Sequence, residues 1–95
     1  MKYLALEVEN KGVKPNQYKP LLKDESKKVL ELYEKGVIRE IYFDQSHCAV
    51  IIMECQSMEE VNDELSKLPL VTNGLIHFTI RELKPYTGFS RLLED

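Results

Sequence analysis

The order of its regular elements most constrains what this chain can fold into. Alternating or continuous apolar runs predict four strands, over Lys2–Glu9, Val37–Asp44, His47–Cys55 and Gly74–Leu83. Helical spacing of apolar residues predicts two helices, over Tyr18–Lys35 and Met58–Leu68. The order strand, helix, strand, strand, helix, strand is that of a ferredoxin-like βαββαβ domain of the α+β class, in which a four-stranded antiparallel sheet carries both helices on one face. A chain of 95 residues is expected to form one such domain, residues 1–95.

Both helices have recognisable signals at their ends. Pro20 is expected in the first turn of the first helix, because a proline deeper inside would remove a backbone hydrogen bond. Gly36 is the expected left-handed residue after that helix. Ser57 and Glu60 form a capping box, which predicts the start of the second helix, and Pro69 is expected to stop it.

The strand over His47–Cys55 is apolar on both faces and is expected in the interior of the sheet. In the usual spatial order the first strand lies between the third and the fourth. We then expect both helices to cover one set of alternate residues: Leu4, Leu6, Val8, Ile76, Phe78 and Ile80. The opposite face would carry the other set: Tyr3, Ala5, Glu7, Leu75, His77, Thr79 and Arg81. Ala49, Ile51 and Met53, or their alternates, would add apolar surface there. A face this mixed is expected to pack on a partner and to keep a pocket.

An apolar segment follows the last strand, where a small domain usually ends in polar residues. Residues 84–95 contain four large apolar side chains: Tyr86, Phe89, Leu92 and Leu93. A domain of this size buries only about 60–65% of its unfolded surface, so it gains stability from self-association. We therefore expect residues 84–95 to form a C-terminal arm that packs on a neighbouring subunit.

Composition excludes several functional classes. The net charge of −3 argues against a nucleic-acid partner, and the third strand lacks the aromatic residues on which an RNA-recognition module stacks bases. No apolar run reaches the roughly 18–20 residues that span a bilayer, and the run after Lys2 is too short for a signal peptide. Cys48 and Cys55 fall on opposite faces of one predicted strand, so no disulfide is expected between them, and a reducing cytoplasm is the expected location.

Three segments resemble those of the muconolactone isomerase family. They are Leu22–Lys27 with the helix end Leu32–Gly36, the strand Ile51–Cys55 followed by Ser57, and Leu68-Pro69-Leu70. The resemblance implies a dimeric α+β barrel, in which two ferredoxin-like sheets face each other, and an isomerase that shifts a lactone's double bond by proton transfer without a cofactor. The family's Leu-Lys-x-x-Glu-Lys pattern fits in two registers, each with one departure. Counting from Leu22 places Ser26 at the Glu position, whereas counting back from Gly36 places Glu25 there and Ser26 at the Lys position.

The most suggestive polar group consists of Glu7, His77 and Arg81, which the expected faces bring together with Tyr3 nearby. In a catalytic interpretation Glu7 accepts a proton, Arg81 anchors an anion, and His77 or Tyr3 donates a proton. In the alternative interpretation Glu7 and Arg81 form a structural ion pair that holds the sheet or the dimer.

Other polar residues are weaker candidates. Tyr42 is expected to point into the barrel in one of the two registers open to its strand. Lys23 belongs to a basic cluster on the first helix that can attract an anionic substrate or remain solvated. His47 and His77 lack the spacing of metal ligands, so we predict no metal and no cofactor. Two hypotheses remain: a cofactor-independent isomerase acting on a small unsaturated acid or lactone, and a non-catalytic ligand-binding or assembly protein built on the same homodimeric barrel.

Overall fold

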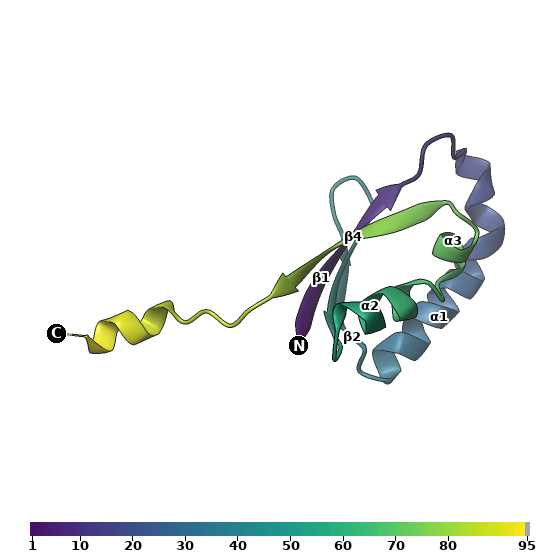
Figure 1. Ribbon diagram of the computed structural model, residues 1–95. Coiled ribbons are helices and arrows are strands. Elements are labelled where there is room, and N and C mark those ends of the chain that lie inside the picture. Colours follow the sequence, from purple (N-terminus) through teal and green to yellow (C-terminus); the bar gives the residue numbers. More distant parts are fainter. Residues whose placement is uncertain (95) are drawn as a thin grey trace.

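Four antiparallel strands form one sheet, with the helices packed against one of its faces (Figure 1). This arrangement comes from a computed structural model that describes residues 1–94. The strands are β1 (Lys2–Glu9), β2 (Ile38–Phe43), β3 (Ala49–Glu54) and β4 (Ile76–Leu83). Their spatial order is β2-β3-β1-β4, so β1 lies between β3 and β4 as predicted. The α+β, ferredoxin-like architecture is confirmed.

The first helix is shorter than predicted, because two single 3₁₀ turns precede it. These turns are η1 (Pro15–Gln17) and η2 (Lys19–Leu21), and α1 follows over Leu22–Glu34. Pro20 lies in the first turn of η2, where its missing N–H is tolerated. Gly36 has a φ of 81°, the left-handed conformation predicted for the residue that ends α1.

The second helix is divided in two. In α2 (Met58–Leu65) the Ser57 hydroxyl accepts a hydrogen bond from the Glu60 amide at 3.2 Å, as the capping box predicts. The Glu60 carboxylate accepts from the Gln56 amide at 2.9 Å, one residue earlier than in the standard box. Pro69 begins a further short helix, α3 (Pro69–Thr72), at a position that suits proline, so its predicted role as the stop of α2 is wrong.

The predicted assignment of the two β1 faces is wrong. Tyr3 is 1% exposed and Ala5 is fully buried, and Ala5 pairs with the core residues Ile51 and Ile80. Since directly paired residues on neighbouring strands point to the same face, Tyr3, Ala5 and Glu7 lie under the helices. Alternation fixes which residues of β1 share a face, but both of its sets are largely apolar, so alternation does not say which set is covered. The prediction for β4 is correct, because Ile76, Phe78 and Ile80 pack into the core.

The opposite face of the sheet, here called the open face, is covered by no helix within residues 1–94 (Figure 1). The strand registers place on it two groups of side chains. The apolar group is Leu4, Leu6, Val8, Val50 and Ile52, and the polar group is Glu40, Tyr42, His77, Thr79 and Arg81. This face combines apolar and polar side chains as predicted, but β1 contributes the opposite set of residues to it.

The C-terminal arm extends away from the rest of the chain and ends in η3 (Gly88–Leu93) (Figure 1). Its four large apolar side chains are 70% to 87% exposed, and Tyr86 and Phe89 contact each other edge to face at 4.9 Å between ring centres. The molecule consequently measures 61 × 26 × 20 Å. Asp95, the last residue of the predicted arm, lies outside the described residues. Within residues 1–94, no helix has the length and apolar character needed to cross a bilayer.

Candidate functional site

Glu7 lies on the covered side of the sheet, near the end of β1. It pairs with Phe78 of β4, and its Oε1 accepts a hydrogen bond from the Ala49 amide at 3.0 Å. The side chain is half-buried. The hydrogen bond fixes one carboxylate oxygen of Glu7 at the beginning of β3.

Glu25 of α1 brings a second carboxylate to the same interior. Its Oε1 accepts a hydrogen bond from the Leu70 amide at 2.9 Å, and the side chain is half-buried. Burial raises the pKa of the Glu25 carboxyl, the Leu70 amide partly offsets this, and the nearby Glu7 carboxylate raises the pKa further. The turn after Leu68-Pro69 therefore presents a backbone donor to Glu25.

Tyr18, between η1 and η2, contributes a phenol. Its ring packs on the buried side chains of Leu70, Leu75 and Ile76. The hydroxyl oxygen is buried. Burial raises the pKa of Tyr18 to about 12, and a hydrogen bond to the Glu9 carboxylate, together with its negative charge, adds to this shift. The phenol is therefore protonated at neutral pH.

Cys48 lies beside this group but is a poor nucleophile. Burial raises the pKa of its thiol, and the carboxylates of Glu7, Asp44 and Glu9 raise it further. Burial also raises the pKa of Cys55. Because the reactive form of cysteine is the thiolate, neither residue is activated. Both cysteines are free, as predicted.

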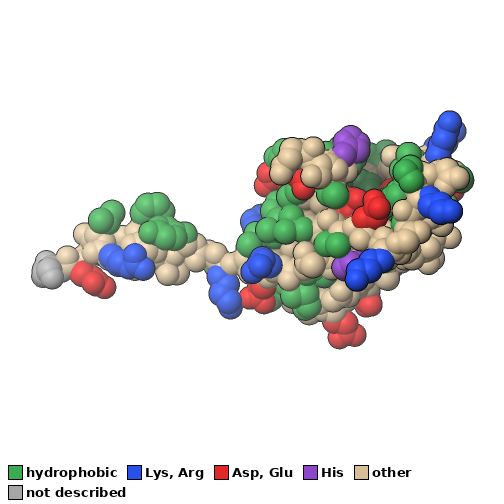
Figure 2. Space-filling model, turned by 90° about the horizontal axis from the view of Figure 1, so that it is seen from above, with side chains coloured by type: hydrophobic (Ala, Val, Ile, Leu, Met, Phe, Trp, Pro, Cys, Tyr) green, Lys and Arg blue, Asp and Glu red, His purple; other side chains and the backbone are tan. Residues whose placement is uncertain are grey.

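We call Glu7, Glu9, Tyr18 and Glu25 the acidic cluster. Seen from above, the surface of the domain is hollowed, and acidic side chains lie in the depression (Figure 2). Two other grooves lie elsewhere on the surface. One, of about 570 Å³, runs between α1 and β2 beside Leu30 and Tyr33, and the other, of about 860 Å³, lies where the arm leaves β4. Neither groove is lined by a residue of the acidic cluster.

The predicted grouping of Glu7 with His77 and Arg81 is wrong. His77 pairs with Val8 and Arg81 pairs with Leu4, so both point to the open face, whereas Glu7 points to the covered face. His77 Nδ1 contacts Asn10 Oδ1 at 2.5 Å. The error follows from the inverted faces of β1, because His77 and Arg81 lie on the face that the sequence predicted for them.

The remaining candidates are not brought together either. Tyr3 is buried at the opposite end of β1, paired with Met53 and Glu82, and burial raises the pKa of its hydroxyl. Tyr42 is exposed on the open face and donates a hydrogen bond to Glu40 at 2.8 Å. Lys23 is exposed on α1. The predicted catalytic and substrate-binding residues therefore do not form one site in a single chain.

The hairpin histidine, His47, is exposed in the turn between β2 and β3. It has a φ of 62° and stacks on Phe43 at 4.0 Å between ring centres. In the part of the chain that the structure describes, no group of three or more His, Cys, Asp or Glu residues is arranged to hold a metal ion.

Sequence analysis did not single out Tyr18 or place Glu25 in the interior. One signal for Glu25 was available, because Glu25, Val29 and Leu32 follow the i, i+4, i+7 spacing of a single helix face. A carboxylate on the buried stripe of α1 is unusual enough to mark a candidate site. Tyr18 had no comparable signal, since it lies in a turn rather than in a periodic element.

The chain resembles known proteins in its structure, whereas comparison of its sequence finds no match. No protein-family profile matches the sequence, and no curated protein sequence matches it. Among solved structures, the chain is similar to muconolactone isomerase, with a TM-score of 0.74, 18% identity and coverage of 92% of both chains. It is also similar to 5-chloro-2-hydroxyhydroquinone dehydrochlorinase from Burkholderia phenoliruptrix AC1100, solved with 2,5-dihydroxybenzoquinone, with a TM-score of 0.64, 17% identity and coverage of 93% of this chain and 98% of that one. The chain therefore has the fold of muconolactone isomerase, as the sequence resemblance implied.

Proposed function

We propose that the protein is a cofactor-independent enzyme that moves a proton on a small unsaturated molecule, with Glu25 as the acid–base group. The observation that carries this proposal is a half-buried carboxyl whose pKa is raised by burial and by Glu7 and whose Oε1 is held by the Leu70 amide. Such an environment brings the basicity of a carboxylate closer to that needed for proton transfer near neutral pH. The fold shared with muconolactone isomerase supports the same class of chemistry.

The proposed reaction needs only the side chains of the acidic cluster. The Glu25 carboxylate takes a proton from a carbon next to a carbonyl group, which leaves an enolate. The protonated Glu25 then returns the proton to another carbon of the conjugated system, so the double bond moves and no atom is gained or lost. The Leu70 amide holds one oxygen of Glu25 and the Ala49 amide holds one oxygen of Glu7. The second carboxylate oxygen of Glu25 is the one that exchanges the proton with the substrate.

This proposal moves the acid–base role from Glu7 to Glu25. Glu7 is retained as the neighbouring charge that keeps the pKa of Glu25 raised. His77 and Arg81 lie on the opposite face, and Tyr3 is buried away from the cluster, so we assign them no contact with this substrate.

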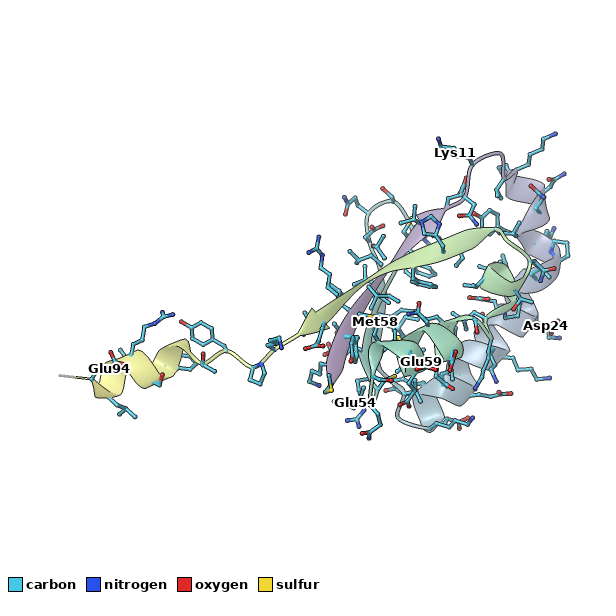
Figure 3. All side chains as sticks on the ribbon, in the orientation of Figure 1. Lys11, Asp24, Glu54, Met58, Glu59 and Glu94 are labelled. Carbon is cyan, nitrogen blue, oxygen red and sulfur yellow. The ribbon has the colours of Figure 1, made fainter. Side chains whose placement is uncertain are left out.

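The test uses muconolactone and its methyl ester as probes in D₂O, with incorporation of deuterium followed by ¹H NMR. Wild-type protein is expected to catalyse the exchange on at least one probe. Glu25→Gln should lower the rate by about 10²- to 10⁴-fold, the usual contribution of a general base. Asp24→Asn is the matched control, since Asp24 precedes Glu25 in α1, is exposed and points away from the sheet (Figure 3). A wild-type rate in Glu25→Gln, or no exchange on either probe by wild-type protein, would contradict the proposal.

A second candidate function is a non-catalytic ligand-binding or assembly protein that uses the same fold. The open face and the exposed arm favour it, because both present large apolar side chains that one chain leaves uncovered. We propose that two chains associate through their open faces in either case. Stable self-association together with an absence of exchange on both probes would favour this second candidate.

A further inference from the structure

The C-terminal arm carries a row of apolar side chains, Tyr86, Phe89 and Leu92, here called the arm stripe. Side chains three residues apart in a 3₁₀ helix lie one above the other, so Phe89 and Leu92 share one side of η3. Tyr86 extends this row, because its ring contacts that of Phe89. The three side chains are 70% to 81% exposed, and the hydrophobic side chains of the arm gather along one side of it (Figure 2). The arm stripe therefore gains free energy from any apolar surface that covers it.

The groove between α1 and β2 is an apolar surface of the kind that the arm stripe needs. Val29, Leu30 and Tyr33 of α1 line one side of it, and Ile41 of β2 lines the other. Leu30 and Tyr33 are each more than half exposed, so the groove is bordered by apolar side chains that its own chain leaves uncovered. A groove of this kind suits a short segment that presents apolar side chains at helical spacing.

The groove and the arm are also matched in length. The α1 residues that line the groove, 26–33, rise about 10 Å along the helix axis. The six residues of η3 rise about 12 Å. The other groove, beside the base of the arm, is lined by the charged residues Lys2, Glu54 and Glu82, so it suits an apolar stripe less well.

The charges of the arm and the groove are complementary. Arg91 lies within η3, and Glu40 lines the groove. None of the ion pairs within residues 1–94 includes either of them. Arg39 also lines the groove, but its Nε donates a hydrogen bond to the Gly36 carbonyl at 2.7 Å. An arm in the groove would thus bring a cation to the Glu40 carboxylate.

The position of the arm favours the groove of another molecule over its own. The arm follows β4, whereas the groove lies beside β2, at the opposite edge of the sheet in the order β2-β3-β1-β4. The arm also runs away from its own domain (Figure 1). It is therefore placed to reach a second chain.

We propose that the arm of one chain docks in the α1–β2 groove of a second copy of this chain. The arm stripe covers Leu30 and Tyr33 there, and Arg91 faces Glu40. Stable interfaces use roughly 20–30 residues a side, and residues 84–95 are fewer, so the docked arm strengthens an assembly that the open faces hold and does not hold two chains alone. This contact is independent of proton transfer by Glu25.

The first test measures the dissociation constant of the assembly by native mass spectrometry over a concentration series. Leu30→Ser should weaken assembly about five- to tenfold in the chain that keeps its arm, because it removes much of the apolar area that the arm covers. In a chain that lacks Tyr86–Asp95, the same substitution should have no effect, since both changes remove one contact. Leu22→Ser is the matched control, because Leu22 is an exposed leucine of α1 outside the groove, and it should have no effect in either chain. Equal weakening with and without the arm, no weakening by Leu30→Ser, or a wild-type chain that stays monomeric would overturn the proposal.

The second test identifies the chain whose arm occupies the groove. Ser90→Cys combined with Ser26→Cys places one thiol on the arm and one at the groove, and Ser90→Cys combined with Ser66→Cys is the control, with the second thiol at the end of α2. A short bismaleimide reagent should join positions 90 and 26 of different chains, as read by mass spectrometry of a mixture of ¹⁴N- and ¹⁵N-labelled protein. Positions 90 and 66 should stay unjoined. A link between positions 90 and 26 of the same chain would show that the arm folds back, and equal linking to position 66 would show that it has no preferred surface; either result would overturn the proposal.

Discussion

The two faces of the sheet differ in what they offer to other molecules. The covered face combines a buried apolar core with a few carboxylates and the phenols of Tyr3 and Tyr18, and burial raises the pKa of both phenols and of Glu25. The open face combines apolar side chains with exposed polar groups such as Tyr42 and His77. Polar groups acquire unusual chemistry where water is excluded, whereas an uncovered apolar sheet is better suited to a protein partner. We therefore assign the chemistry to the covered face and assembly to the open face.

The strongest test of this division uses two adjacent residues of β3. Ile51 is 1% exposed on the covered face, and Ile52 is on the open face. Ile51→Lys should unfold the domain, because it buries an unpaired charge in the core. Ile52→Lys should leave the helix and strand content unchanged and convert the assembly to monomers. Circular dichroism and light scattering after size exclusion measure both effects. If both variants unfold, or if Ile52→Lys still self-associates, the division of the two faces is wrong.

Removal of the arm should have a smaller effect that is confined to assembly. The apolar side chains of the arm are exposed, so deleting Tyr86–Asp95 should leave the Tm of the isolated domain nearly unchanged. The same deletion should lower the oligomeric state or weaken the dimer, because the arm is proposed to pack on a neighbour. Native mass spectrometry over a concentration series measures this. A matched variant, Leu92→Ser with Leu93→Ser, retains the length of the arm and should weaken assembly in the same direction. Unaltered assembly in both variants would count against the arm as a contact.

The smallest expected effect is a difference in titration between two glutamates of α1. Burial raises the pKa of Glu25, whereas the hydrogen bond from Lys28 lowers that of Glu31. Glu25 therefore binds protons more tightly in the folded state, and its contribution to stability falls as pH rises from its unfolded pKa through its folded pKa. Glu25→Gln lacks this pH-dependent loss of stability. The Tm of the variant minus the Tm of wild type should therefore increase as pH increases. Side-chain ¹³C NMR should show Glu25 titrating above Glu31, and Glu7→Gln should lower the pKa of Glu25. The reverse order of titration would contradict the burial of Glu25.

Much of the fold followed from the sequence because its signals are local. The capping residue Ser57, the left-handed Gly36 and the strand periods each act over a few residues, and together they predicted the order of elements and the position of β1 in the sheet. The faces of β1 required more than local information. Tyr3 and Ala5 look no more apolar than Leu4 and Leu6, and the packing of α1 and α2 decides which pair is covered.

The candidate site was less predictable than the fold for the same reason. Exchanging the two faces of β1 moved Glu7 away from His77 and Arg81 and toward Glu25. The contact between Glu25 and the Leu70 amide joins residues 45 positions apart, which no local pattern reports. The helical spacing of Glu25 with Val29 and Leu32 was the one sequence clue to its burial.

The most direct test of the central claim compares Glu25→Gln with Arg81→Gln in the same deuterium-exchange assay, at a concentration where size exclusion shows both variants equally assembled. Each substitution removes one charge, from the covered face in one variant and from the open face in the other. The account predicts that Glu25→Gln lowers the exchange rate by about 10²-fold or more and that Arg81→Gln retains the wild-type rate within about threefold. Loss of exchange in Arg81→Gln with a wild-type rate in Glu25→Gln would place the chemistry on the open face and contradict the account.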